Sequence, residues 1–113
     1  MTTASDFADI TNRRITTNGI ELNIAEQGDP NAPLILLLHG FPESWFSWRH
    51  QFAPLAAAGY HVVAPDMRGY GDSDKPGEIS AYNQIEVAND IRGLVGALGY
   101  STAIVIGHDW GAP

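Results

Sequence analysis

The first part of the chain alternates between apolar and polar residues. Ile20, Leu22 and Ile24 are separated by polar positions, and Asn18-Gly19 precedes them. A period of two is typical of a strand with one buried face, and Asn-Gly suits the two positive-φ positions of a tight hairpin turn. We therefore predict a loose polar leader over residues 1–12, followed by an antiparallel hairpin.

Leu34–Leu38 is a continuous apolar run, and two similar runs follow it, each apolar after its first residue, namely His61–Ala64 and Thr102–Ile106. A short continuous run of this kind indicates a strand that is covered on both faces, as in a parallel sheet. Each run is bounded by turn residues such as glycine and proline, or by a stretch with helical signals. The three runs are therefore predicted to be neighbouring strands of one sheet.

The segments between these runs carry helix signals. The first helix is predicted to begin at Ser47 as its N-cap and to end before Gly59, a plausible C′ glycine. The second is predicted from about Asn83 to Leu98, with Gly99 directly after it, and Asn83 with Glu86 has the spacing of a capping box. Its predicted apolar face consists of Ile85, Ala88, Ile91, Val95 and Leu98. The order of elements predicts an α/β fold, in which an antiparallel hairpin precedes a βαβαβ parallel sheet.

Functional residues in such sheets lie beyond the carboxyl ends of the strands. Gly107-His108-Asp109-Trp110-Gly111 follows the last predicted strand and has the form Gly-x-nucleophile-x-Gly. A sharp strand-to-helix turn lifts the central side chain above the sheet, and only small residues fit beside it. Asp109 is therefore the candidate nucleophile, with Gly107, His108 and Gly111 as structural residues of the elbow. The plainer alternative is an ordinary N-cap aspartate at the start of a helix.

An aspartate at the centre of the elbow selects the chemistry. Its carboxylate has a reference pKa of about 3.9, so it is ionised at neutral pH and needs no base before it attacks. It can form an alkyl-enzyme ester, but only with an activated electrophile such as a strained epoxide or an alkyl halide. Water then attacks the carbonyl carbon of Asp109, and the resulting oxyanion needs backbone N–H donors.

The segment His39-Gly40-Phe41-Pro42 directly follows Leu34–Leu38. In folds with this elbow, one oxyanion donor comes from the loop after that strand and the other from the residue after the nucleophile. The predicted donors are therefore the backbone N–H groups of Phe41 and Trp110. His39 and Gly40 are predicted to be structural residues of the loop. A turn that contains glycine and proline is common, so this segment alone would be weak evidence for an oxyanion loop. Its occurrence together with the elbow makes the prediction specific.

These motifs together resemble the α/β-hydrolase-fold soluble epoxide hydrolases. The resemblance is carried by the two segments above and by Glu43-Ser44-Trp45, Ser47-Trp48-Arg49, Ala58-Gly59-Tyr60 and Asp66-Met67-Arg68-Gly69-Tyr70-Gly71-Asp72-Ser73. It extends from about Ile15 to Pro113 and corresponds to the N-terminal part of the family. It implies conversion of an epoxide to a vicinal diol through Asp109, without a cofactor. It also implies that Phe41, Pro42 and Trp110 contact the substrate.

The resemblance further implies groups that this sequence does not supply. Members of the family use two cap-domain tyrosines to protonate the epoxide oxygen, and a later acid and histidine to activate water. No tyrosine of this chain occupies the tyrosine positions, and neither His39 nor His108 occupies that of the catalytic histidine. Residues 13–113 are therefore expected to be the N-terminal part of the core domain, truncated just after the elbow and inactive alone.

Two alternatives stay open. A haloalkane or haloacid dehalogenase of the same fold would use the same nucleophile. One such family usually has asparagine in place of Phe41, and another tends to have arginine in place of Trp110, so both positions favour the epoxide hydrolase. The other alternative is a catalytically dead fragment that acts only by pairing the apolar edge of its last strand with a partner.

The composition limits the remaining functions. Six basic and thirteen acidic residues give a net charge of −7, which disfavours nucleic acid and anionic membranes as partners. The run Leu34–Leu38 is too short to span a bilayer. Cysteine is absent and the histidines lack a His-x-x-x-His spacing, so no metal site is expected. The expected partners are a small epoxide and either the C-terminal remainder of the enzyme or a second copy, in the cytoplasm.

Several conspicuous residues receive plainer interpretations. The glycine-rich stretch that ends at Ser73 is predicted to be a structural turn beside the site, because it lacks the third glycine of a nucleotide-binding loop. His61 is predicted to be structural, and Arg68 to be a surface residue or a structural partner. Trp45 and Trp48 are assigned either to the pocket or to the core.

Overall fold

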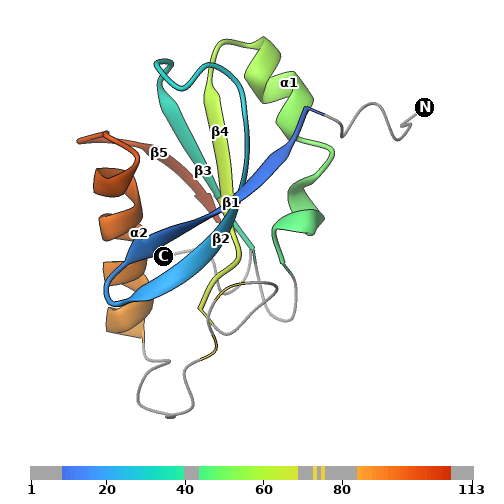
Figure 1. Ribbon diagram of the computed structural model, residues 1–113. Helices are drawn as coiled ribbons and strands as arrows, with labels where there is room; N and C mark the ends of the chain where they lie inside the picture. Colours follow the sequence, from blue (N-terminus) through green and yellow to red (C-terminus); the bar gives the residue numbers. More distant parts are fainter. Residues whose placement is uncertain (1–8, 40–43, 69–72, 74, 76–83, 108–113) are drawn as a thin grey trace.

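The computed structural model describes residues 9–39, 44–68, 73, 75 and 84–107 (Figure 1). In chain order, its elements are β1 (Thr11–Thr17), β2 (Ile20–Gln27), β3 (Leu34–Leu38), the 3-10 helix η2 (Trp45–Trp48), α1 (Phe52–Ala57), β4 (His61–Pro65), α2 (Gln84–Ala97) and β5 (Ile104–Gly107). β1 begins inside the segment that the sequence pattern assigned to the leader.

The five strands form one mixed sheet in the order β1-β2-β4-β3-β5. β2 pairs antiparallel with both β1 and β4, whereas β3 pairs parallel with both β4 and β5. This arrangement confirms an α/β fold with an opening hairpin and three parallel strands. At the hairpin turn, Asn18 and Gly19 have φ values of 50° and 78°, as the Asn-Gly signal predicts.

The two helices cover opposite faces of the sheet (Figure 1). Alternate residues of each strand point to opposite faces, so the apolar strands β3 and β4 contribute to two hydrophobic clusters. The cluster under α2 contains Leu36, Val63 and Leu94, and the cluster under α1 contains Leu37, Val62 and Phe52. Every residue of β3 and β4 is buried, which explains why their sequences lack alternation.

The strand β5 differs from the other two parallel strands. It begins at Ile104, two residues later than predicted, and it lies at the edge of the sheet with β3 as its described neighbour. Ile104, Val105 and Ile106 are 49%, 44% and 39% exposed. An apolar strand with this much exposed surface is a site at which other chain segments can pair or pack.

The predicted start of the first helix at Ser47 is wrong. Ser44 caps the 3-10 helix η2 by accepting a hydrogen bond from the Phe46 N–H, and the Ser47 hydroxyl donates to the Ser44 carbonyl. α1 begins only at Phe52. Pro54 lacks an N–H and is tolerated in the first turn of a helix, so it limits how far the helix can extend toward the N-terminus.

Both helices end as the sequence predicts, at a glycine with positive φ. Gly59 and Gly99 have φ values of 100° and 88°. Each donates its N–H to a carbonyl of the last turn, and the next residue, Tyr60 or Tyr100, donates to the carbonyl one residue earlier. These paired bonds form the Schellman motif, which satisfies carbonyls at the end of the helix. The predicted N-cap Asn83 lies outside the described residues.

The predicted apolar face of α2 is wrong in its first half. Ile85 is 73% exposed and Ala88 is also exposed, whereas Asp90 and Leu94 are buried. The partly buried residues of α2 that pack on the core are Val87, Ile91 and Val95. Val87, Ile91, Leu94 and Val95 recur at helical spacing, so the face that packs on the sheet is apolar apart from Asp90. Within the part of the chain that the structure describes, no helix is long and apolar enough to cross a membrane.

Gly93 allows α2 to approach the hairpin closely. A Cβ at Gly93 would lie 2.2 Å from Oγ1 of Thr17, whose hydroxyl donates to the Asp90 carbonyl at 2.8 Å. A Cβ at Gly96 would have no heavy atom within 4 Å. The two glycines therefore offer a matched pair of substitutions on one helix.

We predict that Gly93→Ala and Gly96→Ala change stability in opposite directions. Gly93→Ala should lower the free energy of unfolding by about 1–3 kcal/mol, because the new methyl group overlaps Thr17. Gly96→Ala should raise it by about 0.5–1 kcal/mol through helix propensity. Denaturant unfolding of the intact native polypeptide measures both, and Thr17→Ala should relieve part of the Gly93→Ala loss. Stabilisation by Gly93→Ala would contradict the close approach.

Candidate functional site

The carboxyl ends of β3 and β5 lie side by side. Their parallel register pairs Leu38 with Gly107. The predicted oxyanion segment begins at the residue after Leu38, and the predicted elbow begins at Gly107 itself. The two segments that the sequence assigned to catalysis therefore leave the sheet from directly paired positions, although Leu38 and Gly107 are 69 positions apart in the sequence (107 minus 38).

The structure describes two of the predicted site residues, His39 and Gly107. The remaining ones lie outside the described residues, namely Gly40, Phe41, Pro42, His108, Asp109, Trp110 and Gly111. Gly107 is the last residue of β5 and is partly exposed. The structure therefore describes the surroundings of the predicted site. These are the ends of the strands and the side chains that form hydrogen bonds near them.

His39 connects the end of β3 to the turn that follows β4. It is only 2% exposed, and its Nε2 accepts a hydrogen bond from the Met67 N–H at 2.8 Å. Nε2 must be unprotonated to accept this bond, so any proton on a neutral ring is on Nδ1. In this arrangement the imidazole acts as a hydrogen-bond acceptor between two backbone segments.

Asp66, directly after β4, receives hydrogen bonds from two different elements. Its Oδ1 accepts from the Trp45 N–H at 2.7 Å, and its Oδ2 accepts from Nδ2 of Asn23 at 3.2 Å. The side chain of Ser73 donates to the Asp66 carbonyl and accepts from the Asn23 N–H at 2.8 Å. Sequence reasoning assigned no role to Asp66. The available signal was an aspartate at the carboxyl end of a buried strand.

Arg68 forms a buried, two-pronged ion pair with Asp90 of α2. Its Nε and one terminal nitrogen lie 2.6 and 2.7 Å from the two carboxylate oxygens, and both side chains are at most 3% exposed. Asn18 of the hairpin turn also donates to Asp90, at 3.0 Å. Arg68 is therefore a structural partner rather than a surface residue. The two tryptophans, Trp45 and Trp48, pack against the cluster that contains Phe52.

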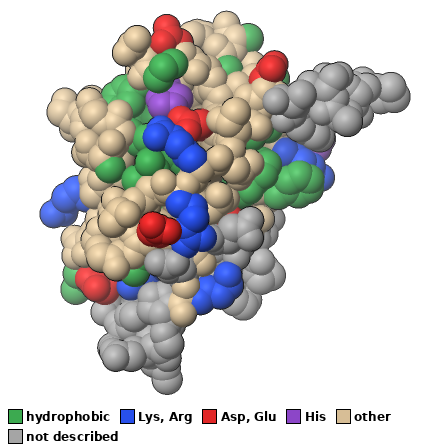
Figure 2. Space-filling view, viewed as in Figure 1, with side chains coloured by type: hydrophobic (Ala, Val, Ile, Leu, Met, Phe, Trp, Pro, Cys, Tyr) green, Lys and Arg blue, Asp and Glu red, His purple; other side chains and the backbone are tan. Residues whose placement is uncertain are grey.

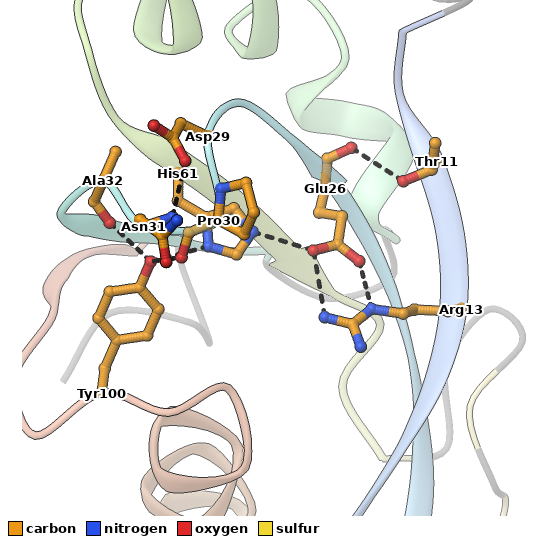
Figure 3. Close-up of polar contacts among 9 residues, drawn as sticks. All are labelled: Thr11, Arg13, Glu26, Asp29, Pro30, Asn31, Ala32, His61 and Tyr100. Atoms are coloured by element: carbon orange, nitrogen blue, oxygen red, sulfur yellow. Dashed lines mark hydrogen bonds and ion pairs between the residues drawn. The ribbon is translucent and has the colours of Figure 1, made fainter.

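A second polar network lies at the opposite, amino-terminal edge of the parallel strands (Figure 3). His61 begins β4, with Nε2 2.9 Å from Oε1 of Glu26 and Nδ1 3.0 Å from the Tyr100 hydroxyl. That hydroxyl is 2.7 and 2.6 Å from the carbonyl oxygens of Pro30 and Ala32. His61 thus has a structural environment, as the sequence predicts, and it lies away from the candidate site.

Two groups of this network have shifted pKa values. Burial acts to raise the pKa of Glu26, but hydrogen bonds from Arg13 and His61 outweigh it and hold that pKa below its usual value of 4.5. Burial and then the carboxylates of Asp29 and Glu26 raise the pKa of Tyr100. The network therefore favours an ionised Glu26 and a protonated Tyr100 in the folded protein.

The charged side chains on the face seen in Figure 2 are mixed in sign. Arg13 pairs with Glu26, and Arg14 pairs with Glu21 at 2.8 Å between strands β1 and β2. These cross-strand pairs place an acidic group beside each arginine of β1. Among the residues described by the structure, no group of three or more histidine, aspartate or glutamate side chains is arranged to hold a metal ion.

The chain is similar to known proteins in both sequence and structure. The family model described as alpha/beta hydrolase fold matches residues 33–113. Epoxide hydrolase A of Mycobacterium tuberculosis is 51% identical over 102 residues, which are 90% of this chain and 32% of the relative. Epoxide hydrolase 3 of Siraitia grosvenorii is 48% identical over 98 residues, which are 87% of this chain and 30% of the relative.

The solved structures give a similar result. The crystal structure of an epoxide hydrolase from Vigna radiata superposes with a TM-score of 0.90 at 45% identity, covering 94% of this chain and 34% of that one. This chain thus spans about a third of the length of the curated relatives that it matches.

We predict that Glu26→Gln destabilises the protein in a pH-dependent way. Because the folded-state pKa of Glu26 is lowered, its stabilising contribution is present above pH 4.5 and is lost as the pH falls through the folded-state value. The difference in unfolding free energy from the unsubstituted protein should be about 1–3 kcal/mol above pH 4.5 and should shrink below it.

Glu21→Gln is the matched control for this measurement. It also replaces a β2 glutamate that faces an arginine, but the Glu21 side chain is 52% exposed, and such pairs contribute less than about 1 kcal/mol. Denaturant unfolding across a pH series compares the variants. A Glu26→Gln difference that stays constant through the acid range would contradict the assignment.

Proposed function

The chain belongs to the α/β-hydrolase fold family, and we propose that it is part of an epoxide hydrolase whose nucleophile is Asp109. The observation that carries the proposal is the parallel pairing of Leu38 with Gly107. This register brings together the origins of the two segments that must cooperate in such a site, the oxyanion loop and the elbow. Relatives named epoxide hydrolase, at about 50% identity, support the choice of substrate class.

The first chemical step opens the epoxide ring. An oxygen of the Asp109 carboxylate attacks one ring carbon, the bond from that carbon to the ring oxygen breaks, and an ester forms. The ring oxygen leaves as an alkoxide and takes up a proton. By resemblance to the family, that proton comes from tyrosines outside residues 1–113. Phe41, Pro42 and Trp110 contact the epoxide while it reacts.

The second step hydrolyses the ester. Water loses a proton to a base and attacks the carbonyl carbon of Asp109. The backbone N–H groups of Phe41 and Trp110 stabilise the resulting oxyanion. When this intermediate collapses, the bond between the acyl carbon and the ester oxygen breaks, that oxygen takes the proton back from the base, and the vicinal diol leaves. The diol carries away one original oxygen of Asp109, and the carboxylate is restored with an oxygen from water.

We predict that the first turnover leaves the label from ¹⁸O-water on Asp109 and not in the diol. A single turnover of styrene oxide by excess intact native polypeptide, followed by mass spectrometry of the diol and of the peptide with Asp109, measures this distribution. Direct attack of water on the epoxide would instead label the diol at once. That result would exclude Asp109 as the nucleophile.

The variants Asp109→Ala and Asp109→Asn provide the controls. Asp109→Ala should abolish diol formation, because no carboxylate remains to attack. Asp109→Asn should retain substrate binding, because its shape is conserved, but should form no ester. Release of halide from an alkyl halide, with no diol formed from epoxides, would favour the dehalogenase alternative. Substantial diol formation by Asp109→Ala would refute the assignment.

A further inference from the structure

We propose that Asp66 and His39 are positioning residues that hold the proposed oxyanion loop from its two ends. The inference rests on the proposed function, because it assigns these residues to the hydrolysis of an ester on Asp109. His39 stands immediately before Gly40-Phe41-Pro42, and Trp45 stands shortly after it. Both flanking residues are described, and both are hydrogen-bonded to the turn after β4.

The two bonds end on consecutive residues of that turn. His39 Nε2 accepts from the Met67 N–H at 2.8 Å, and the Trp45 N–H donates to Asp66 Oδ1 at 2.7 Å. One bond therefore holds the chain where it leaves β3, and the other holds it where η2 begins. Fixing both ends of a short segment to one rigid support restricts the positions available to the backbone N–H groups between them.

The support is itself tied to the sheet. Asn23 lies on β2, its carbonyl accepts from the Asp66 N–H at 2.8 Å, and its side chain donates to Asp66 Oδ2 at 3.2 Å. Ser73 adds bonds to both Asp66 and Asn23. Asn23, Asp66 and Ser73 are each at most 5% exposed. Asp66 thus fixes the position of Trp45 relative to a strand of the sheet rather than to another loop.

A carboxylate is needed at position 66 because two donors approach it from different elements. Each carboxylate oxygen accepts one of them, the Trp45 N–H or the Asn23 amide. An asparagine has the same shape but only one acceptor oxygen, and its NH₂ group would face the other donor. Asp66→Asn therefore removes at least one of the two bonds with little change in volume.

The proposed role predicts an effect on one chemical step. The oxyanion develops only when water attacks the ester, whereas ring opening precedes it. A displaced donor should therefore slow ester hydrolysis more than ester formation. A general loss of stability would not select between the two steps.

The test is a single-turnover measurement with styrene oxide on the intact native polypeptide that carries this sequence. Samples quenched over time are analysed by mass spectrometry for the ester on Asp109 and for the diol. For Asp66→Asn we expect ester hydrolysis to slow by about tenfold or more, so that the ester accumulates. Ring opening should change by less than about threefold, since it needs no oxyanion hole.

Glu26→Gln is the matched control, because it also converts a largely buried, hydrogen-bonded carboxylate into an amide, at the opposite edge of the sheet. It should leave the ratio of the two rate constants unchanged. His39→Gln and His39→Leu form a second, independent pair. Glutamine retains an acceptor for the Met67 N–H and should largely preserve ester hydrolysis, whereas leucine should slow it.

Three results would decide against a proposal, and they can be told apart. If the unsubstituted enzyme makes diol without passing through an ester on Asp109, the proposed function is wrong. If the ester forms but Asp66→Asn and His39→Leu slow both steps equally, the positioning role is wrong and the function stands. If Asp66→Asn does not fold, the contrast between His39→Gln and His39→Leu decides, and equal rates for these two overturn the positioning role.

Discussion

The parallel pairing of β3 with β5 determines where the chain leaves the sheet after Leu38 and after Gly107, two positions that are far apart in the sequence. In the observed register Leu38 is opposite Gly107, so the strand ends coincide at one edge. β3 can define this edge because it lies between β4 and β5 and is buried along its whole length. A shift of the register by one residue would exchange the faces to which the side chains of the shifted strand point, and it would separate the ends of the two strands.

Apolar burial can hold the sheet against its helices, but it gives little direction to the chain beyond the strand ends. Hydrogen bonds give that direction, and a polar network lies at each edge of the parallel strands, partly buried at one edge and buried at the other. His61 and Glu26 join the turns at the amino-terminal edge, whereas His39 and Asp66 do so at the carboxyl edge. Buried polar groups of this kind are costly when unpaired, so each network is stable only in one arrangement of its turns.

Local patterns were sufficient to predict the hairpin, β3, β4 and the glycines that end both helices. They were insufficient where two patterns in the sequence compete. On α2 the apolar residues Val87, Ile91 and Leu94 recur at helical spacing and form the buried face, beside the Asp90 that pairs with Arg68, whereas the predicted face began at Ile85. In the same way, the motifs predict the two segments of the proposed site, but the partners of His39 and Asp66 lie on other elements of the fold. No spacing rule in one sequence reveals such pairing.

The three consecutive residues after β4, Asp66, Met67 and Arg68, each form hydrogen bonds with a different part of the structure. Asp66 holds Trp45 and Asn23, Met67 offers its N–H to His39, and Arg68 binds Asp90 of α2. The side chain of Met67 also packs in the core cluster that contains Leu94 of α2. The turn thereby connects β2, the loop after β3 and α2. A change in any one of these contacts alters the support that the other two share, so we expect substitutions within this group to be non-additive.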